Sequence, residues 1–147
     1  MRVLVLHGPN LNLLGTREPE IYGRTTLAEI NKALGVLAGE LSASVDCRQS
    51  NHEGVLVDWV QECANGGFDG LLFNFGALTH TSLALADAIR ATAVPAVEVH
   101  VSNIHAREAF RRVTHTGEVA VGVVTGFGPE SYLLGLRGLI ARIRPTN

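Results

Sequence analysis

Two amides, an arginine and a tyrosine stand close together in the segment 8–23, directly after the apolar run 3–6. They are Asn10, Asn12, Arg17 and Tyr22. The segment also holds two prolines and three glycines and has neither helical nor strand periodicity, which predicts a long loop. Long ordered loops in compact domains are usually functional, so this loop is a candidate for proton-transfer chemistry. A solvated surface loop is the alternative interpretation.

Glu98 and His100 form a second candidate pair. They are two residues apart on a predicted strand, so their side chains share a face of the sheet. The carboxylate can then orient or charge the imidazole. The alternative is that both lie in solvent at the rim of the sheet.

Two further pairs have helical spacing. His80 and Asp87 are seven residues apart, about two helical turns, which predicts one shared face, although the segment 79–82 alone also fits a simple helix start. Arg107 and Arg111 are at i and i+4 of a predicted helix and could hold an anion or a polyol. Pairing with Glu108 on a solvated face is the alternative.

Several signatures of other chemistry are absent. The chain has no Gly-x-Gly-x-x-Gly after the first strand, no Gly-Lys-Ser/Thr phosphate loop and no Gly-x-Ser-x-Gly elbow. The six histidines lack a paired metal-ligand spacing, and His100 with His105 would need further ligands. Lys32 lies within the first predicted helix, far from the other candidates, which argues against a Schiff base. Proton transfer without a metal or cofactor is the kind of chemistry that is left after these exclusions.

Elements that can position these residues alternate along the chain. Strands are predicted near 2–6, 44–49, 69–74, 95–100 and 119–124, and three helical faces are marked by Leu27 to Leu41, Leu56 to Cys63 and Leu133 to Ile143. Helix starts are indicated by two capping boxes, Thr26 to Glu29 and Ser50 to Glu53, and by Pro129 at a first helical position. The pattern predicts an α/β fold, a flavodoxin-like three-layer doubly wound domain with a five-stranded parallel sheet. In such a domain, the segments after strands one, three and four meet at one edge.

Length and composition favour one domain, residues 1–147. The chain has 46% hydrophobic residues and a formal net charge of −2, so neither a nucleic-acid surface nor a polybasic membrane anchor is expected. No window approaches the ~20 apolar residues of a membrane span, and the first apolar run is too short for a signal peptide. Cys47 and Cys63 lack Cys-x-x-Cys spacing and fit core thiols. We expect a cytoplasmic protein.

Three motifs resemble those of the type II 3-dehydroquinate dehydratases, and the resemblance runs over nearly the whole chain. They are the loop 8–23, the segment 79–82 with Asp87, and the segment 98–112. The resemblance implies anti elimination of water from 3-dehydroquinate to 3-dehydroshikimate through an enolate, without metal or cofactor. It also implies a homo-oligomer, a dodecamer of trimers.

The resemblance also implies a role for each matching residue. Tyr22 resembles the base that removes the proton beside the ketone, and His100 the acid that protonates the departing hydroxyl. Arg17 is similar to the group that stabilises the intermediate, and Asn10 to the holder of a water at the enolate oxygen. The implied substrate-binding residues are Asn74, His80, Val101, Ser102 and Arg111, with Asp87 reaching a neighbouring subunit's site.

One departure from the family pattern and one physical condition accompany these roles. The family commonly has arginine before the aspartate, where this chain has Ala86, which affects the expected subunit contact. A tyrosine base at neutral pH needs its pKa lowered by about 3 units from about 10, more than one exposed arginine supplies. We therefore expect residues 16–23 to form a lid that excludes water around Tyr22 and Arg17.

Other functions compete with this interpretation. A receiver domain would need an acidic pair after strand one and an aspartate after strand three, where this chain has Gly8-Pro9-Asn10 and Asn74-Phe75-Gly76. A flavin carrier would be yellow on purification. A hydro-lyase acting on another polyol keto acid could use the same base, acid and anion site, and the pathway could be aromatic biosynthesis or quinate breakdown.

Overall fold

The fold is built on a five-stranded parallel sheet. The structure, a computed structural model, describes residues 1–16, 20 and 23–144. The strands are β1 (Arg2–His7), β2 (Ser44–Gln49), β3 (Gly70–Asn74), β4 (Ala96–His100) and β5 (Gly122–Thr125). Their order is β2-β1-β3-β4-β5, and every pair is parallel. This confirms the predicted sheet, although β5 begins at Gly122 rather than at 119, because a short helix occupies 117–119.

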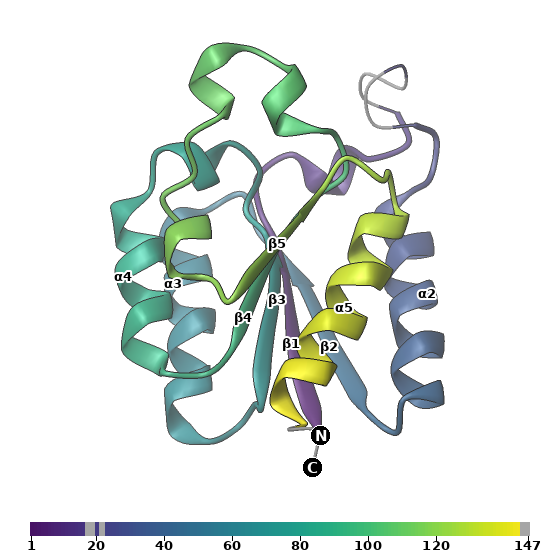
Figure 1. Cartoon of the computed structure of the whole chain (residues 1–147), viewed down its shortest axis with the longest axis vertical. Coiled ribbons are helices and arrows are strands. Elements are labelled where there is room, and N and C mark those ends of the chain that lie inside the picture. Colours follow the sequence, from purple (N-terminus) through teal and green to yellow (C-terminus); the bar gives the residue numbers. More distant parts are fainter. Residues whose placement is uncertain (17–19, 21–22, 145–147) are drawn as a thin grey trace.

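Helices cover both faces of the sheet. The α-helices are α2 (Leu27–Glu40), α3 (Glu53–Gln61), α4 (Leu83–Thr92) and α5 (Glu130–Ile143). Short 3-10 helices are η1 (Leu11–Leu13), η2 (Glu62–Asn65), η3 (Gly76–His80), η4 (Ile104–Ala106), η5 (Ala109–Arg111) and η6 (Gly117–Val119). Figure 1 shows α2 and α5 on one side of the sheet and α3 and α4 on the other. This is the doubly wound, three-layer arrangement that the sequence predicts, and the strand order is that of flavodoxin-like folds.

Alternating side chains of the strands make two cores. Val3 and Val5 of β1 pack with α2 and α5, whereas Leu4 and Leu6 pack with α3 and α4. Period-two alternation therefore divides each strand between the two layers. Residues 3–7 of β1 are fully buried on both faces of the sheet, which explains the continuous apolar run 3–6.

The three predicted helix starts have different outcomes. At α2, the Thr26 hydroxyl accepts from the Glu29 N–H and the Glu29 carboxylate accepts from the Thr26 N–H, so this capping box is confirmed. The predicted box at Ser50 is wrong. Helix α3 begins two residues later, with His52 as its N-cap, and the Ser50 hydroxyl accepts from the His52 N–H. The Glu53 carboxylate accepts instead from the hydroxyl of Ser82, the N-cap of the facing helix α4.

The third start differs by one position. Pro129 is the N-cap of α5, and the helix begins at Glu130. Proline at this boundary lacks only a backbone donor that the first helical turn cannot use.

The connection from β4 to β5 contains no long helix. Arg107 follows η4 and Arg111 ends η5, so the predicted i, i+4 pair is not on one helix. His80 and Asp87 are also separated, because η3 ends at His80 and α4 begins at Leu83. Ser82 interrupts the helical path between them, since its hydroxyl accepts from the Leu85 N–H as the N-cap of α4.

The loops after β1, β3 and β4 meet above the carboxyl ends of the strands, as Figure 1 shows at the top of the molecule. The order reverses between β1 and β3, which is where ligands bind in this class of sheet. Within the part of the chain that the structure describes, no helix is long and apolar enough to cross a membrane.

Candidate active site

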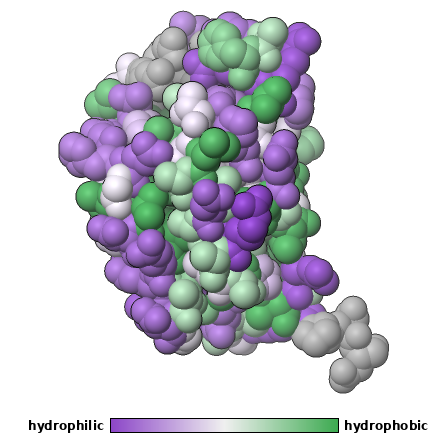
Figure 2. Space-filling view, turned by 90° about the vertical axis from the view of Figure 1, so that its left-hand side faces the viewer, coloured by the Kyte–Doolittle hydropathy of each residue, from purple (hydrophilic) through white to green (hydrophobic). Residues whose placement is uncertain are grey.

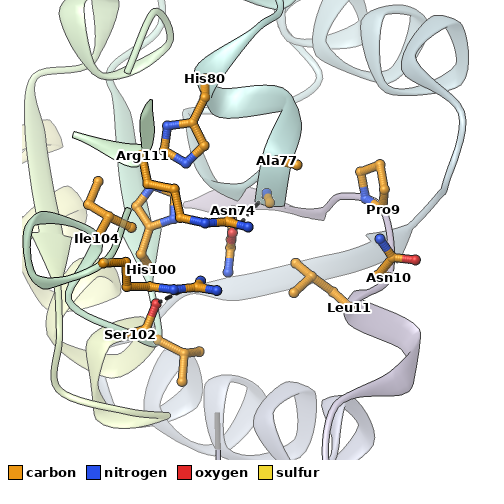
Figure 3. Close-up of a pocket in the computed structure, with 13 residues that line it drawn as sticks. Pro9, Asn10, Leu11, Asn74, Ala77, His80, His100, Ser102, Ile104 and Arg111 are labelled. Carbon is orange, nitrogen blue, oxygen red and sulfur yellow. Dashed lines mark hydrogen bonds between the residues drawn. The ribbon is translucent and has the colours of Figure 1, made fainter. Parts of the chain in front are cut away.

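A depression of about 550 Å³, including its open mouth, lies at this edge of the sheet. Its walls come from the three loops that the sequence singles out. The lining residues are Pro9, Asn10 and Leu11 after β1; Asn74 at the end of β3, followed by Gly76, Ala77 and His80; and His100 at the end of β4, followed by Val101, Ser102, Ile104, Arg107 and Arg111. Figure 3 shows His80, Asn74, Arg111 and Asn10 around this space. Seven predicted site residues therefore line one pocket.

The first wall depends on an unusual backbone at Asn10. This residue has φ 69°, in the left-handed region that asparagine tolerates better than most residues. Its N–H donates to Asn51 Oδ1 over 2.9 Å, and Asn51 also accepts from the Gln49 amide at 3.1 Å. The same Gln49 amide donates to the Gly8 carbonyl, so the end of β2 holds the loop after β1.

Close packing joins the first and second walls. The N–H of Gly8 donates to the Asn74 carbonyl over 2.7 Å. A Cβ at position 8 would lie 2.5 Å from the Phe75 carbonyl oxygen, so only glycine fits there.

His100 and Glu98 are buried beneath the third wall. His100 Nε2 lies 3.4 Å from Glu98 Oε2, and the exposed fractions of the two residues are 5% and 0%. Both side chains therefore lie inside the protein, which contradicts the alternative of two rim residues in solvent. The other carboxylate oxygen of Glu98 accepts from the Thr116 hydroxyl. Glu98 is thus held where it can orient the imidazole.

His80 lies across the pocket from Asn10. Its Nδ1 donates to the Val113 carbonyl over 2.7 Å, so Nε2 is the acceptor nitrogen of the neutral ring. Burial lowers the pKa of His80, which favours that neutral form. Its ring is nearly parallel to that of His100, with 6.3 Å between the centroids. The two imidazoles therefore form one side of the site.

Two arginines make the third wall cationic. Arg111 donates to Glu108 over 2.8 Å, and an Arg107 nitrogen lies 3.5 Å from the Ser102 hydroxyl. In Figure 3 the Arg111 side chain reaches into the space between His80 and Asn74. Glu108 is at the surface, and its own N–H and Arg111 lower its pKa, so it is ionised. The expected pairing with Glu108 is present, and both guanidinium groups still line the pocket and can hold a carboxylate.

Val101 and Ser102 are held by the end of β5 and by the loop that follows it. The Gly128 N–H donates to the Val101 carbonyl, and the Thr125 hydroxyl donates to the Ser102 carbonyl, at 2.9 and 2.8 Å. These bonds fix the backbone of the third wall to the end of β5 and to the loop that follows it.

Of the ten predicted site residues, two lie outside the described residues and one, Asp87, lies away from this pocket. Arg17 and Tyr22, with most of the predicted lid, lie outside the described residues. Asp87 is on α4 with its side chain 73% exposed, paired with Arg90 at 3.0 Å, and does not line the pocket of its own chain. Among the described residues, no three His, Cys, Asp or Glu side chains gather as metal ligands.

Two polar residues below the pocket floor, His7 and Tyr132, were not among the predicted site residues. Both are fully buried, and Tyr132 donates to or accepts from His7 and Asn74. The available signal was weak: a histidine at the end of an apolar strand and one tyrosine in a leucine-rich helix.

Comparison with known proteins places these features in context. Residues 1–140 match the family model described as dehydroquinase class II. A 3-dehydroquinate dehydratase of Geotalea daltonii is 58% identical over 144 residues, covering 98% of this chain and 99% of that protein. One of a Nostoc species is also 58% identical, covering 98% and 97%.

Solved structures agree with these sequence matches. The crystal structure of a type II dehydroquinase from Butyrivibrio crossotus superposes with a TM-score of 0.92 at 38% identity, covering 95% of this chain and 97% of that one. The chain is thus similar to these enzymes in sequence and in fold.

Proposed function

Because the chain belongs to the class II dehydroquinase family, we propose that its pocket removes water from 3-dehydroquinate to give 3-dehydroshikimate by anti elimination through an enolate. The chain is a hydro-lyase, and its role in the shikimate pathway follows from the family. The observation that carries the proposal is a buried histidine facing a pocket with two arginines on the same wall. The histidine can supply a proton, and the two arginines can hold the carboxylate of a ring substrate.

His100 is the proposed acid. Its Nε2 lies 3.4 Å from Glu98 Oε2, and both atoms are buried without a hydrogen-bond partner among the described residues. The His100 side chain also lines the pocket, so the imidazole lies between the carboxylate and the space for substrate. Thr116 donates to Glu98 and so keeps the carboxylate oriented toward the ring.

Tyr22 is the proposed base, Arg17 the group that stabilises the enolate, and Asn10 the holder of a water at the enolate oxygen. The roles of Tyr22 and Arg17 rest on the motif 8–23 that this chain shares with the family pattern. For Asn10 the pocket adds support, because this residue lines it opposite His80. The proposed lid, residues 16–23, would exclude water around these groups, so that the positive charge of Arg17 stabilises the tyrosinate more strongly than it could in water.

Asn74, His80, Val101, Ser102 and Arg111 are the proposed substrate-binding residues. They surround the pocket and combine amide, imidazole, hydroxyl and guanidinium groups, which suits a carboxylated polyol. No metal or cofactor takes part in the proposed reaction.

We propose a homo-oligomer, a dodecamer of trimers, in which Asp87 reaches a neighbouring subunit's site. Asp87 is exposed and lies outside its own pocket, which fits such a role. Large apolar side chains are also exposed: Leu83, Phe110, Val113, Val121, Val123 and Phe127. Figure 2 shows apolar residues interspersed with polar ones on the side where α3 and α4 lie.

We further propose one catalytic domain, residues 1–147, located in the cytoplasm and without a nucleic-acid partner.

The experiment is a turnover assay with 3-dehydroquinate on the purified chain. His100→Ala and Tyr22→Phe should each lower kcat by on the order of 10²-fold or more, as for loss of a positioned acid or base. His105→Ala, an exposed histidine outside the pocket, is the matched control and should keep kcat. Activity should survive a chelator and also borohydride added with substrate. A fully active His100→Ala enzyme would contradict the proposed acid.

A further inference from the structure

A chain of buried hydrogen bonds runs beneath the pocket and ends at Asn74. Asn31 Oδ1 lies 2.8 Å from His7 Nε2, and His7 Nδ1 lies 3.0 Å from the Tyr132 hydroxyl. The same hydroxyl lies 3.2 Å from Asn74 Nδ2. The chain joins α2, β1, α5 and β3, and only its last member lines the pocket.

The backbone sets the direction of these bonds. The Gly76 N–H donates to Asn74 Oδ1 over 3.0 Å, so the amide nitrogen of Asn74 must face Tyr132 and donate to its hydroxyl. That hydroxyl then donates to His7 Nδ1, and the opposite end of the ring, Nε2–H, donates to Asn31. The reverse direction would leave the Tyr132 proton without an acceptor among the described residues, a costly state for a buried group.

Burial keeps the residues of this hydrogen-bonded series uncharged. His7 and Tyr132 are fully buried, and Asn74 is 3% exposed. Burial lowers the pKa of His7 to about 4 and raises the pKa of Tyr132, so both are neutral at pH 7. His7 and Asn74 are also direct partners in the register of β1 and β3, so their side chains leave the same face of the sheet.

We propose that Tyr132 and His7 are positioning residues that hold the Asn74 amide in one orientation for substrate. This rests on the proposed role of Asn74 in substrate binding. After its two internal bonds, the amide keeps one N–H and one oxygen lone pair. A donor beside an acceptor matches a substrate hydroxyl, which can accept and donate at once, better than it matches a carboxylate, which only accepts. The orientation of Asn74 therefore selects for a hydroxyl at this place in the pocket.

The test is a double-mutant cycle on KM with Tyr132→Phe and Asn74→Ala. Tyr132→Phe should raise KM about tenfold and change kcat by less than about threefold, since one oriented contact is lost. In the Asn74→Ala background, the same change should raise KM less than about twofold. Ile140→Val on α5 is the matched control, because it removes one methylene from the same core at a position eight residues, about 12 Å along the helix axis, from Tyr132. Equal effects of Tyr132→Phe in both backgrounds, or an equal rise in the control, would overturn the proposal.

Variants of His7 keep the test decisive if Tyr132→Phe does not fold. His7→Gln retains a donor and an acceptor and should keep KM within about threefold, whereas His7→Leu should raise KM as Tyr132→Phe does. If the two variants have the same KM, the hydrogen bonds of His7 do not position Asn74.

Nitrogen NMR of the His7 ring gives a readout that needs no turnover. At pH 7 we expect the neutral ring with its proton on Nε2, and a change of tautomer population in Tyr132→Phe. A protonated ring, or a neutral ring with its proton on Nδ1, would contradict the proposed direction of the hydrogen bonds from Asn74 to Asn31. If the tautomer is as expected but Asn74→Ala leaves KM unchanged, Asn74 does not bind substrate, and the positioning proposal falls with that assignment.

Discussion

Gly117 leaves the space that the Glu98 carboxylate occupies, and Gly117→Ala tests whether that space matters for activity. A Cβ at position 117 would lie 2.8 Å from Glu98 Oε2, the oxygen that faces His100, and would also overlap the Thr114 hydroxyl. The Thr116 hydroxyl holds the other oxygen of Glu98, so the carboxylate has little freedom to turn away.

The size of the effect follows from these distances. An ordinary contact begins at 3.4 Å, so Glu98 Oε2 must move by about 0.6 Å, the difference between 3.4 and 2.8 Å. Misplacement of a catalytic constellation by 1 Å can cost about 10²-fold in rate, so we expect kcat to fall on the order of tenfold. Overpacking should also lower the free energy of unfolding by about 1 to 3 kcal/mol.

The assay follows the ultraviolet absorbance of the conjugated enone product at saturating 3-dehydroquinate, with a thermal melt of each variant. Gly122→Ala is the matched control, because a Cβ there meets nothing within 4 Å. It should keep kcat and lose no stability. A Gly117→Ala enzyme with unchanged kcat, despite a lower melting temperature, would refute a catalytic role for the position of Glu98.

Three other properties can be measured directly. The pKa of His7 is lowered to about 4, against 6.5 in the unfolded chain, so as the pH falls the unfolded state takes up a proton at a higher pH than the folded state does. The neutral His7 should therefore contribute about 3 kcal/mol to the free energy of unfolding above pH 6.5, and this contribution should be lost as the pH falls to 4. In urea unfolding measured across this pH range, His7→Asn has no such proton to bind, so its free energy of unfolding should fall less steeply with pH. Burial raises the pKa of Cys47 to about 12 and of Cys63 to about 11, so thiol reagents at pH 8 should label the native protein far more slowly than the unfolded one. Thr26→Ala should cost about 1 kcal/mol of stability through the lost cap and leave kcat unchanged, and a kcat defect would show that α2 does more than support the sheet.

Local patterns in the sequence were sufficient for the layered fold. Helix α2 was predicted from its apolar spacing and from the Thr26 capping box, and both are interactions within a few residues of the chain. The sheet edge that holds the site was also predicted from the order of strands and helices, because parallel strands bring their carboxyl ends together. His100 and Asn74 therefore fall in one pocket, as predicted.

Other features depended on contacts between distant parts of the chain. Ser50 and Glu53 have the spacing of a capping box, but the Glu53 carboxylate binds Ser82 on the facing helix, 29 residues away. His7 and Tyr132 are 125 residues apart, and nothing near either one indicates the bond between them.

Only packing decides such pairs. A buried polar group must find a partner, and which partner is within reach depends on how α5 lies against β1. The sequence by itself determined the five strands, the helices α2, α3 and α5, and the edge of the sheet that holds the site, because periodicity and caps act over a few residues. The tertiary structure decided the orientation of Asn74, the burial of Glu98 with His100 and the separation of Asp87 from its own pocket, because each results from side chains that folding brings together or keeps apart.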